Sequence, residues 1–196
     1  MHRSLAPSAW IQRWSHLVPD QGTVLDVACG YGRHLRWFHQ RNHAVAGVDR
    51  DVEAIFSVAS LGEVLTADIE GGPWPFMTGC GAQAQLRRFD AVVVCNYLWR
   101  PLLPLILDSV RPGGLLLYET FASGNEQFGK PSRPDFLLQP GELLRLCERL
   151  SVVAYEDVYL DDPPRCVQRI AALKPASSNG SIDVIQKFGA RNPELC

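Results

Sequence analysis

The sequence has no strong excess of charge and no long apolar run. Of its 196 residues, 19 are Lys or Arg and 21 are Asp or Glu, which leaves a formal net charge of −2. This balance gives no field that favours nucleic acid or an anionic membrane. No run approaches the length of a membrane-spanning helix, and the first residues lack the apolar core of a signal peptide. We therefore expect a cytoplasmic protein without nucleic-acid or membrane partners.

The sequence also lacks the cysteine spacings that signal a metal or redox site. Its six cysteines include no C-x-x-C pair. Cys29 and Cys95 fall beside predicted strand ends, where a free thiol behaves as a small hydrophobic side chain. We expect reduced thiols, as in the cytoplasm, and no metal site.

Length and composition predict one folded domain. The chain is long enough for a substantial core, and its hydrophobic content of 46% is ordinary for a globular protein. We assign residues 1–174 to this domain. Residues 175–196 are polar, and we expect them to form a loosely ordered tail. The sequence contains no internal repeat, and a monomer or a homodimer is compatible with it.

The most informative stretch is a strand, a glycine turn and a helix in residues 23–35. The apolar, β-branched run 23–28 predicts a buried parallel strand, and a helical pattern begins near Arg33. The turn between them contains Gly30 and Gly32, whose missing Cβ atoms would let a ligand approach the backbone. Such a turn brings backbone N–H groups against a nucleotide-like ligand.

The spacing of this turn disfavours a nicotinamide cofactor. A dinucleotide fingerprint, G-x-G-x-x-G or A, needs a third small residue that packs the helix onto the strand. Counting from Gly30 and Gly32, that position is Leu35, which is bulky. A nicotinamide-dependent oxidoreductase is therefore a weaker hypothesis. A further alternative is that the glycine turn only connects the strand to the helix and binds no ligand.

Acidic residues follow the next two predicted strands. Asp49 ends the run 44–48 and lies 23 residues beyond Asp26, the usual spacing for a carboxylate that binds a ribose diol. The alternative is that Asp49 caps the following helix, which we place at 52–61. Asp68 ends a predicted strand at 63–68, and its alternative is a turn aspartate.

Two later strands complete the pattern. Residues 89–97 form a strongly apolar run that ends in Asn96 and Tyr97, and the R-P-G-G turn at 111–114 leads into another apolar strand. Ligands of open α/β sheets lie at the carboxyl ends of the strands, which makes Asn96 and Tyr97 site candidates. We place helices at 8–18, 101–110 and 140–150, a surface loop at 71–86, and a closing hairpin from strands at 151–160 and 166–174.

Residues 20–120 resemble the class I S-adenosylmethionine (SAM) methyltransferases, with a weaker match to about 174. Asp26, Ala28, Gly30 and Gly32 resemble the D-x-G-x-G-x-G motif, with Ala28 in place of the first glycine. The chain is most similar to the bacterial tellurite-resistance-like and methyltransferase-domain groups. The resemblance implies an α/β, Rossmann-like, doubly wound three-layer sandwich, whose seven-stranded sheet is mostly parallel with an antiparallel closing strand.

The same resemblance implies SAM as the cofactor and a binding residue at each strand end. It assigns Asp68 and the backbone of Ile69 to the adenine. The full predicted set is Asp26, Ala28, Cys29, Gly30, Gly32, Asp49, Arg50, Asp68, Ile69, Cys95 and Asn96.

The predicted reaction is transfer of a methyl group to a small molecule by in-line displacement. An oxygen or nitrogen acceptor usually needs a base, and we name Tyr97, Glu119 and His34 as candidate catalytic residues. The absence of an Asn/Asp-Pro-Pro-Tyr/Phe motif argues against nucleobase amines as acceptors. The remaining alternative is a non-catalytic SAM-binding regulatory protein.

Two further segments have a candidate role near the substrate. The long stretch 121–138 carries Phe128, Lys130 and Arg133, and we favour a loop that closes over an anionic acceptor. In the predicted helix 8–18, Trp10 and Arg13 either overhang the cofactor or simply cover the core, and the apolar spacing favours the core.

Overall fold

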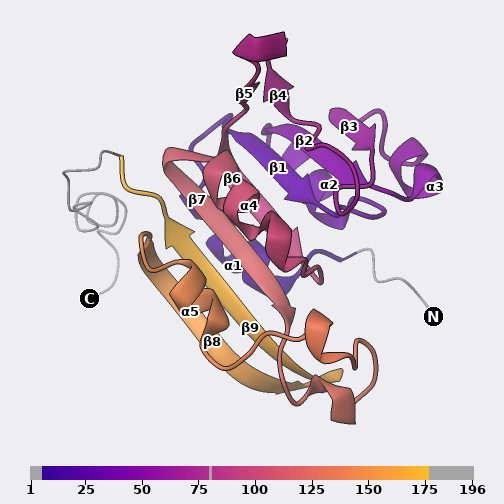
Figure 1. The fold of residues 1–196 in the computed structure, drawn as a ribbon, viewed down its shortest axis with the longest axis vertical. Helices are drawn as coiled ribbons and strands as arrows, with labels where there is room; N and C mark the ends of the chain where they lie inside the picture. Colours follow the sequence, from indigo (N-terminus) through magenta and orange to yellow (C-terminus); the bar gives the residue numbers. More distant parts are fainter. Residues whose placement is uncertain (1–5, 80, 177–196) are drawn as a thin grey trace.

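One sheet organises the computed structural model, which describes residues 6–79 and 81–176 (Figure 1). In these residues the sheet is seven-stranded, in the order β3-β2-β1-β6-β7-β9-β8. Its strands are β1 (Thr23–Val27), β2 (Ala44–Asp49), β3 (Glu63–Thr66), β6 (Phe89–Cys95), β7 (Val110–Phe121), β8 (Ser151–Asp161) and β9 (Pro164–Leu173).

All neighbours from β3 to β7 pair in parallel, whereas β9 is antiparallel to both β7 and β8. The predicted mostly parallel sheet with an antiparallel closing strand is therefore confirmed. The order changes direction between β1 and β6, which is where ligands bind in sheets of this kind.

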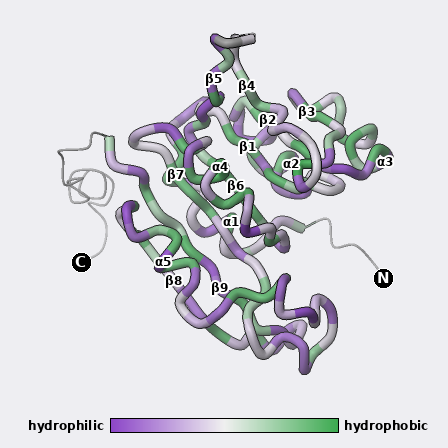
Figure 2. Tube along the Cα trace, in the orientation of Figure 1, coloured by the Kyte–Doolittle hydropathy of each residue, from purple (hydrophilic) through white to green (hydrophobic). Residues whose placement is uncertain are grey.

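Helices cover both faces of the sheet, which makes three layers (Figure 1). One core contains side chains of α1 (Ala9–Trp14), α2 (Arg33–His39) and α3 (Val52–Phe56). The other contains side chains of α4 (Leu103–Ser109) and α5 (Glu142–Leu146). Because both faces are covered, every residue of β6 is buried, and hydrophobic residues concentrate on the central strands (Figure 2). The predicted three-layer architecture is confirmed.

Several helices are shorter than their sequence patterns predict. The pattern at 8–18 yields α1 followed by the 3-10 turn Ser15–Leu17, and the pattern at 52–61 yields only the five residues of α3. Ser8 caps α1 by accepting a hydrogen bond from the backbone of Trp10, and Asp51 caps α3. The residue that caps this helix is therefore Asp51 and not Asp49, for which a cap was the alternative role.

The segment 71–86, expected to be a surface loop, includes a small hairpin of β4 (Met77–Thr78) and β5 (Gln85–Leu86). Trp74 and Phe76 precede it and are buried. Phe76 packs edge-to-face against Phe89 of β6, with ring centroids 5.6 Å apart. These aromatic residues therefore anchor the hairpin to the core.

The R-P-G-G segment is continuous with β7, which begins at Val110. Its Arg111 forms an ion pair with Asp90, and Asp90 also accepts hydrogen bonds from the backbone and hydroxyl of Thr23, at 2.9 and 2.8 Å. A single buried carboxylate thus joins the first residues of β1 and β6 to the start of β7.

The segment 121–138 is held by several hydrogen bonds, including two from one arginine. Arg100 binds both carboxylate oxygens of Glu142 and donates to the backbone oxygens of Asp135 and Leu137, at 2.7 and 2.9 Å. Asn125 is buried and donates to the backbone oxygen of Pro131. Two 3-10 turns lie in this segment, Asn125–Gln127 and Pro134–Phe136. The segment is therefore an ordered part of the structure.

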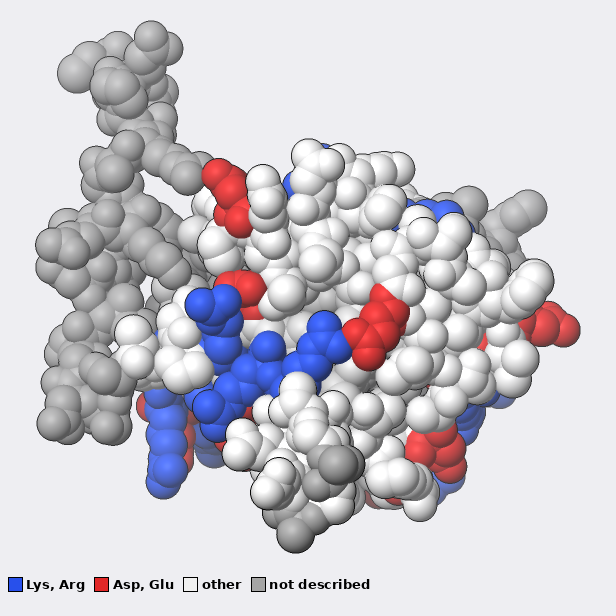
Figure 3. All heavy atoms as spheres, turned by 90° about the horizontal axis from the view of Figure 1, so that it is seen from above, with Lys and Arg blue, Asp and Glu red and all other residues white. Residues whose placement is uncertain are grey.

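The surface shows charges of both signs. On the face drawn in Figure 3, Lys and Arg side chains gather in one band with acidic side chains beside it. Within the described ranges, none of the helices has the length and apolar character needed to cross a membrane. Most of the predicted polar tail, residues 177–196, lies outside the described residues.

Candidate active site

Tight turns at the carboxyl ends of β1 and β6 open the site. Ala28 follows β1 with a φ of +54°, and Asn96 follows β6 with a φ of +56°. Asparagine adopts this left-handed conformation more readily than most residues, whereas alanine is strained there by about 1–2 kcal/mol. The strain at Ala28 explains why a glycine is typical of this position in the motif that the sequence resembles.

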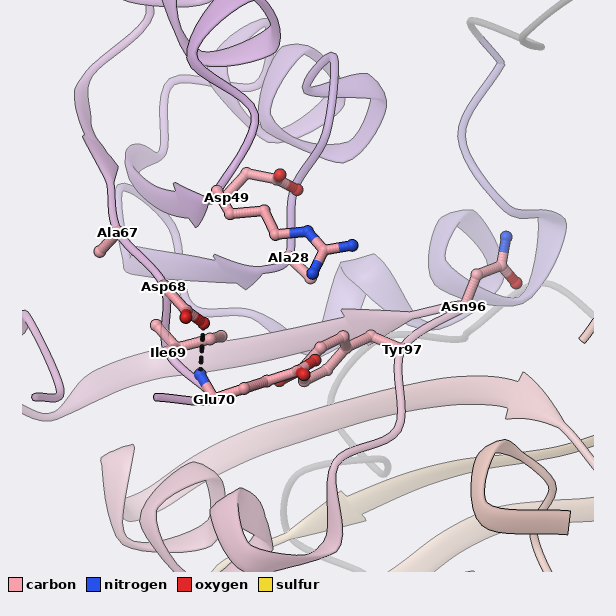
Figure 4. Close-up of a pocket in the computed structure, with 9 residues that line it drawn as sticks. Ala28, Asp49, Ala67, Asp68, Ile69, Glu70, Asn96 and Tyr97 are labelled. Carbon is pink, nitrogen blue, oxygen red and sulfur yellow. Dashed lines mark hydrogen bonds between the residues drawn. The ribbon is translucent and has the colours of Figure 1, made fainter. Parts of the chain in front are cut away.

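These turns line a cavity of about 260 Å³, which we call the Asp49 pocket. Figure 4 shows Asp49 on one side of it, Asp68, Ile69 and Glu70 on another, and Asn96 at one end. Its lining comprises Ala28, Asp49, Arg50, Ala67, Asp68, Ile69, Glu70, Asn96 and Tyr97. The structure therefore brings together seven of the residues predicted from sequence: Ala28, Asp49, Arg50, Asp68, Ile69, Asn96 and Tyr97.

The Asp49 carboxylate is fixed by two backbone amides. Its Oδ2 accepts from Gly30 N at 2.8 Å, and its Oδ1 accepts from Asp51 N at 2.9 Å. Each carboxylate oxygen has a second lone pair, so the group can still accept from two neighbouring hydroxyls of a ligand. The carboxylate is thus held in one orientation at the wall of the pocket.

Asp68 is shaped by its own turn. Its Oδ1 accepts from Glu70 N at 3.0 Å, the bond drawn in Figure 4, and from Gly71 N at 3.3 Å. The turn aspartate expected as an alternative is therefore present. It also lines the pocket, so the turn and a ligand contact are compatible.

Tyr97 follows Asn96 after β6 and also lines the Asp49 pocket. Burial, followed by the neighbouring carboxylates of Glu70 and Asp68, raises the pKa of its phenol. A phenol whose pKa is raised stays protonated at neutral pH and cannot accept a proton. This charge state disfavours Tyr97 as a base and leaves the orienting role of a catalytic candidate open to it.

The two glycines of the first turn serve different purposes. A Cβ on Gly30 would meet no atom within 4 Å, and the residue has a φ of +51°. A Cβ on Gly32 would lie 2.6 Å from Cγ1 of Val58. Gly30 thus borders open space, whereas Gly32 is required by packing against Val58.

Leu35, which is too bulky for the third small position of a dinucleotide fingerprint, packs against Gly47 of β2. A Cβ on Gly47 of β2 would lie 2.9 Å from Cδ1 of Leu35 and 3.0 Å from Sγ of Cys29. The small residue that lets the helix approach the sheet is therefore on β2. The side chain of Cys29 is buried next to Gly47 and faces the core, so only the backbone of Cys29 is available on the other side of the turn.

Asp26 has an unusual environment for a buried carboxylate. It is 2% exposed, and its Oδ2 accepts no hydrogen bond from any group that the structure describes. His34 Nδ1 is its neighbour at 3.7 Å, beyond hydrogen-bond length. An unpaired buried carboxylate oxygen costs free energy and would gain from a cationic partner, although Asp26 itself lines neither the Asp49 pocket nor the second cavity of the site.

A second cavity, of about 510 Å³, adjoins the first at Asn96, which lines both. We call it the Glu119 pocket. Its walls come from the segment before α1, the end of β7, the segment 121–138 and the β8–β9 turn. They comprise Ala6, Pro7, Ser8, Ala9, Arg33, Asn96, Glu119, Phe121, Asn125, Phe128, Gly129, Lys130, Pro163, Pro164, Arg165 and Arg169.

Glu119 is the buried acid of this pocket, 5% exposed. Its Oε1 accepts a hydrogen bond from Ser8 Oγ at 3.0 Å, and its Oε2 lies 3.5 Å from Arg169. Arg169 is also paired with Glu156 and lies over the ring of Trp10. Both carboxylate oxygens are therefore oriented by side chains that come from distant parts of the chain.

Cys95 lies between the two pockets and lines neither. Arg33 donates to its Sγ at 3.0 Å, and Glu119 Oε1 is 3.8 Å from the sulfur. Burial is the main cause that raises the pKa of Cys95 to about 12, so the thiol is protonated and inert at neutral pH. It contributes shape and packing at the end of β6.

His34, the third predicted catalytic residue, lines neither pocket. Its ring is buried, and its Nε2 accepts from the backbone N–H of Ser8 at 3.2 Å. The ring proton therefore sits on Nδ1, directed toward Asp26. These contacts correct the expectation that His34 is a base for the acceptor.

The cations near the acceptor differ in part from those expected. Lys130 lines the Glu119 pocket, but Arg133 pairs with Asp135 and stacks over Phe136. Arg165, from the β8–β9 turn, lines the pocket instead. Among residues 6–79 and 81–176, neither Lys130 nor Arg165 has a carboxylate partner.

Sequence reasoning missed Ser8, Arg33, Arg165 and Arg169. Ser8 shows only the pattern of a helix cap, and its contact with Glu119 spans 111 positions. Trp10 and Arg13, the residues suggested as a lid, line neither pocket; Trp10 is buried and Arg13 lies over Trp14. Across the described ranges, no group of three or more His, Cys, Asp or Glu residues is placed to hold a metal ion.

Comparison with solved structures identifies the fold. TehB from Haemophilus influenzae superposes with a TM-score of 0.70 at 16% identity, over 88% of this chain and 64% of that protein. A SAM-dependent methyltransferase from Methanosarcina mazei gives a TM-score of 0.64 at 14% identity, over 88% of this chain and 100% of the other. Coclaurine N-methyltransferase, solved with N-methylheliamine and SAH, superposes with a TM-score of 0.60 at 14% identity, over 84% of this chain and 70% of that protein.

The chain thus has the fold of SAM-dependent methyltransferases, as its motifs predicted. It spans slightly less than two thirds of the length of the Haemophilus protein. At the level of sequence, no family model and no curated protein matches it.

Proposed function

We propose that the protein is a SAM-dependent methyltransferase that acts on a small-molecule acceptor. The observation that carries this proposal is the meeting of the two pockets at Asn96, at the carboxyl end of β6. Methyl transfer needs donor and acceptor in line and in contact, so adjacent pockets with one shared wall are the required arrangement. The fold and the fit of the Asp49 pocket to an adenosine-like ligand support the assignment.

The cofactor would be held by residues of four strand ends. Asp49 would accept from the ribose hydroxyls, and Asp68 with the backbone of Ile69 would bind the adenine edge. Tyr97 would cover the ring. The unpaired Oδ2 of Asp26 supports a role for this carboxylate toward the methionine ammonium group, and Gly30 gives the room for its approach.

When bound, SAM supplies an electrophilic methyl group on its sulfonium. The chain's own residues would then orient the acceptor, exclude water and receive its proton. Glu119 is the candidate base, because it is buried, lines the second pocket and is oriented by Ser8 and Arg169. A thiol or another soft acceptor needs less help from a base, whereas an alcohol or ammonium acceptor depends on it.

The acceptor would carry an anionic group. Lys130 and Arg165 both line the Glu119 pocket and have no carboxylate partner among the described residues. Arg165 donates to the backbone oxygens of Asp162 and Pro163, which fixes the guanidinium at the pocket rim. A planar, fixed guanidinium in the same pocket as an ammonium suits recognition of a carboxylate or phosphate group.

Calorimetric titration with SAM, S-adenosylhomocysteine and NAD tests the cofactor. We expect both sulfur nucleotides to bind and NAD not to bind. A screen of carboxylate-bearing alcohols, amines and thiols, with their neutral esters as matched controls, would then follow release of S-adenosylhomocysteine. Binding of NAD alone would overturn the proposal. Binding of the sulfur nucleotides without turnover of any acceptor would favour the non-catalytic SAM-binding protein.

The variant Glu119→Gln separates binding from chemistry. We expect it to bind S-adenosylhomocysteine with little change, because Glu119 does not line the Asp49 pocket, and to lose about 100-fold or more in turnover of an alcohol or amine acceptor. Unchanged turnover would exclude Glu119 as the base.

A further inference from the structure

A chain of polar contacts leads from Asp26, a buried residue of β1 that lines neither pocket, to the wall of the Glu119 pocket. It begins at the unpaired Oδ2 of Asp26, which is 3.7 Å from His34 Nδ1. His34 Nε2 accepts from the backbone N–H of Ser8 at 3.2 Å. Ser8 Oγ then donates to Glu119 Oε1 at 3.0 Å. Four residues from three distant parts of the sequence are thus connected in one line.

The residues around Ser8 make this chain consequential. Ala6, Pro7, Ser8 and Ala9 line the Glu119 pocket, so their position sets the shape of one wall. Beyond them, Trp10 and Ile11 are buried in the core, with Arg169 over the ring of Trp10. The segment 6–9 precedes a firmly packed helix, and its contacts include those of Ser8 with His34 and Glu119 and the hydrogen bond that Gln12 Nε2 donates to the backbone oxygen of Pro7, at 2.9 Å.

His34 lies between Asp26 and Ser8, with one ring nitrogen near each. Because its Nε2 accepts from Ser8, its proton lies on Nδ1 and faces Asp26. In the structure as it stands, that proton is slightly too far from the carboxylate for a hydrogen bond. A cationic group bound to Asp26 would supply the missing partner of the carboxylate. The hydrogen bond between His34 Nδ1 and Asp26 Oδ2, now 3.7 Å apart, could then form as part of the same network.

We propose that His34 and Ser8 are positioning residues, through which a cofactor bound at Asp26 fixes the segment 6–9 as a wall of the acceptor pocket and aims the Glu119 carboxylate. This inference rests on the proposed function, because it takes the ligand of Asp26 to be SAM or S-adenosylhomocysteine. It implies that the acceptor pocket is completed only after the cofactor binds, so the cofactor adds first.

Amide hydrogen exchange followed by NMR tests the coupling with S-adenosylhomocysteine as the probe. In the wild-type protein, saturation with this nucleotide should slow exchange of the Ser8 amide about fivefold or more, the change expected when one hydrogen bond is strengthened. The amide of Val18, at the far end of the N-terminal helical region and away from both pockets, serves as an internal control and should not change.

Two substitutions of His34 identify the route. His34→Phe keeps an aromatic ring but has no acceptor for Ser8, so the nucleotide should no longer slow the Ser8 amide. His34→Gln keeps an amide oxygen that can accept from Ser8, and it should restore a large part of the effect. Ser8→Ala retains the backbone bond to His34 and should retain the exchange effect, while losing the contact with Glu119.

The outcomes separate this inference from the proposed function. If calorimetry shows that the nucleotide binds but the Ser8 amide exchanges at the same rate with and without it, the coupling is wrong and the cofactor assignment stands. Equal responses in His34→Phe and His34→Gln would likewise overturn the route through His34. Absence of nucleotide binding to the wild-type protein would overturn both proposals. Should His34→Phe fail to fold, the wild-type comparison and His34→Gln still decide the matter.

Discussion

Replacement of Asp49 by alanine offers the sharpest test of the cofactor pocket. The carboxylate is fixed by Gly30 N and Asp51 N at 2.8 and 2.9 Å, with its remaining lone pairs available to the pocket. Loss of its hydrogen bonds to two ribose hydroxyls should weaken S-adenosylhomocysteine by about 1–3 kcal/mol. This corresponds to an increase in Kd of roughly 5- to 150-fold.

The matched control is Asp51→Ala, two residues away. Asp51 caps α3 by accepting from the backbones of Glu53 and Ala54, and it does not line the pocket. We expect this variant to lose about 1 kcal/mol in the free energy of unfolding, with an unchanged Kd for the nucleotide. Asp49→Ala should therefore lower the affinity for the nucleotide, whereas Asp51→Ala should lower only the stability of the fold.

The measurement is calorimetric titration, at a temperature well below the unfolding midpoint of either variant, with chemical denaturation run in parallel. An Asp49→Ala protein that binds the nucleotide as tightly as the wild type refutes the ribose assignment. So does a loss of affinity of equal size in Asp51→Ala, because the effect would then come from the shared turn rather than from the carboxylate.

Two further predictions concern the turn and the buried thiols. Gly32→Ala should lower the free energy of unfolding by about 2–4 kcal/mol, because its Cβ would clash with Val58 at a φ of +68°. Gly30→Ala should cost only about 1 kcal/mol in stability but lose about tenfold or more in nucleotide affinity; equal effects of the two changes on affinity would contradict the division of roles. Burial raises the pKa of Cys95 and of Cys147 to about 12 from 9.0, so the unfolded chain loses these protons first as the pH rises. The free energy of unfolding should therefore be unaffected by these thiols below pH 9 and fall above it by about 1.4 kcal/mol per pH unit for each thiol, and Cys147→Ala should remove one thiol's share from denaturation curves recorded up to pH 11.

The sequence predicts the sheet better than its helices. Buried parallel strands are continuous apolar runs, so 23–28 and 89–97 are visible without tertiary information, and the glycine turn after the first of them fixes the site at that edge. Helix ends depend on local competition instead. The apolar spacing at 52–61 continues past Phe56, but Ser57 hydrogen-bonds to the backbone oxygen of Ala54 and the helix ends there.

Most of the lining of the Asp49 pocket could be predicted from the sequence, whereas in the Glu119 pocket only Glu119, Asn96 and the loop residues Phe128 and Lys130 were. Asp49 and Asp68 occupy positions set by strand length and spacing, which a single sequence displays. The contact between Ser8 and Glu119, and the approach of Arg165 and Arg169, depend on how the β8–β9 hairpin closes against β7. Pairing over such distances leaves no local pattern, and the choice of Arg133 over Arg165 shows the consequence.

The two pockets draw on different parts of the chain. The Asp49 pocket is assembled from one continuous stretch, positions 28 to 97. The Glu119 pocket, apart from Arg33 and Asn96, comes from the residues before β1 and from those after residue 118. The chain is thus partitioned into a central segment that can be retained and flanking segments that can be exchanged. Exchange of the residues before β1 and after residue 118 should therefore change which molecule the Glu119 pocket accepts, while β1 with Asp26 and the whole Asp49 pocket are retained.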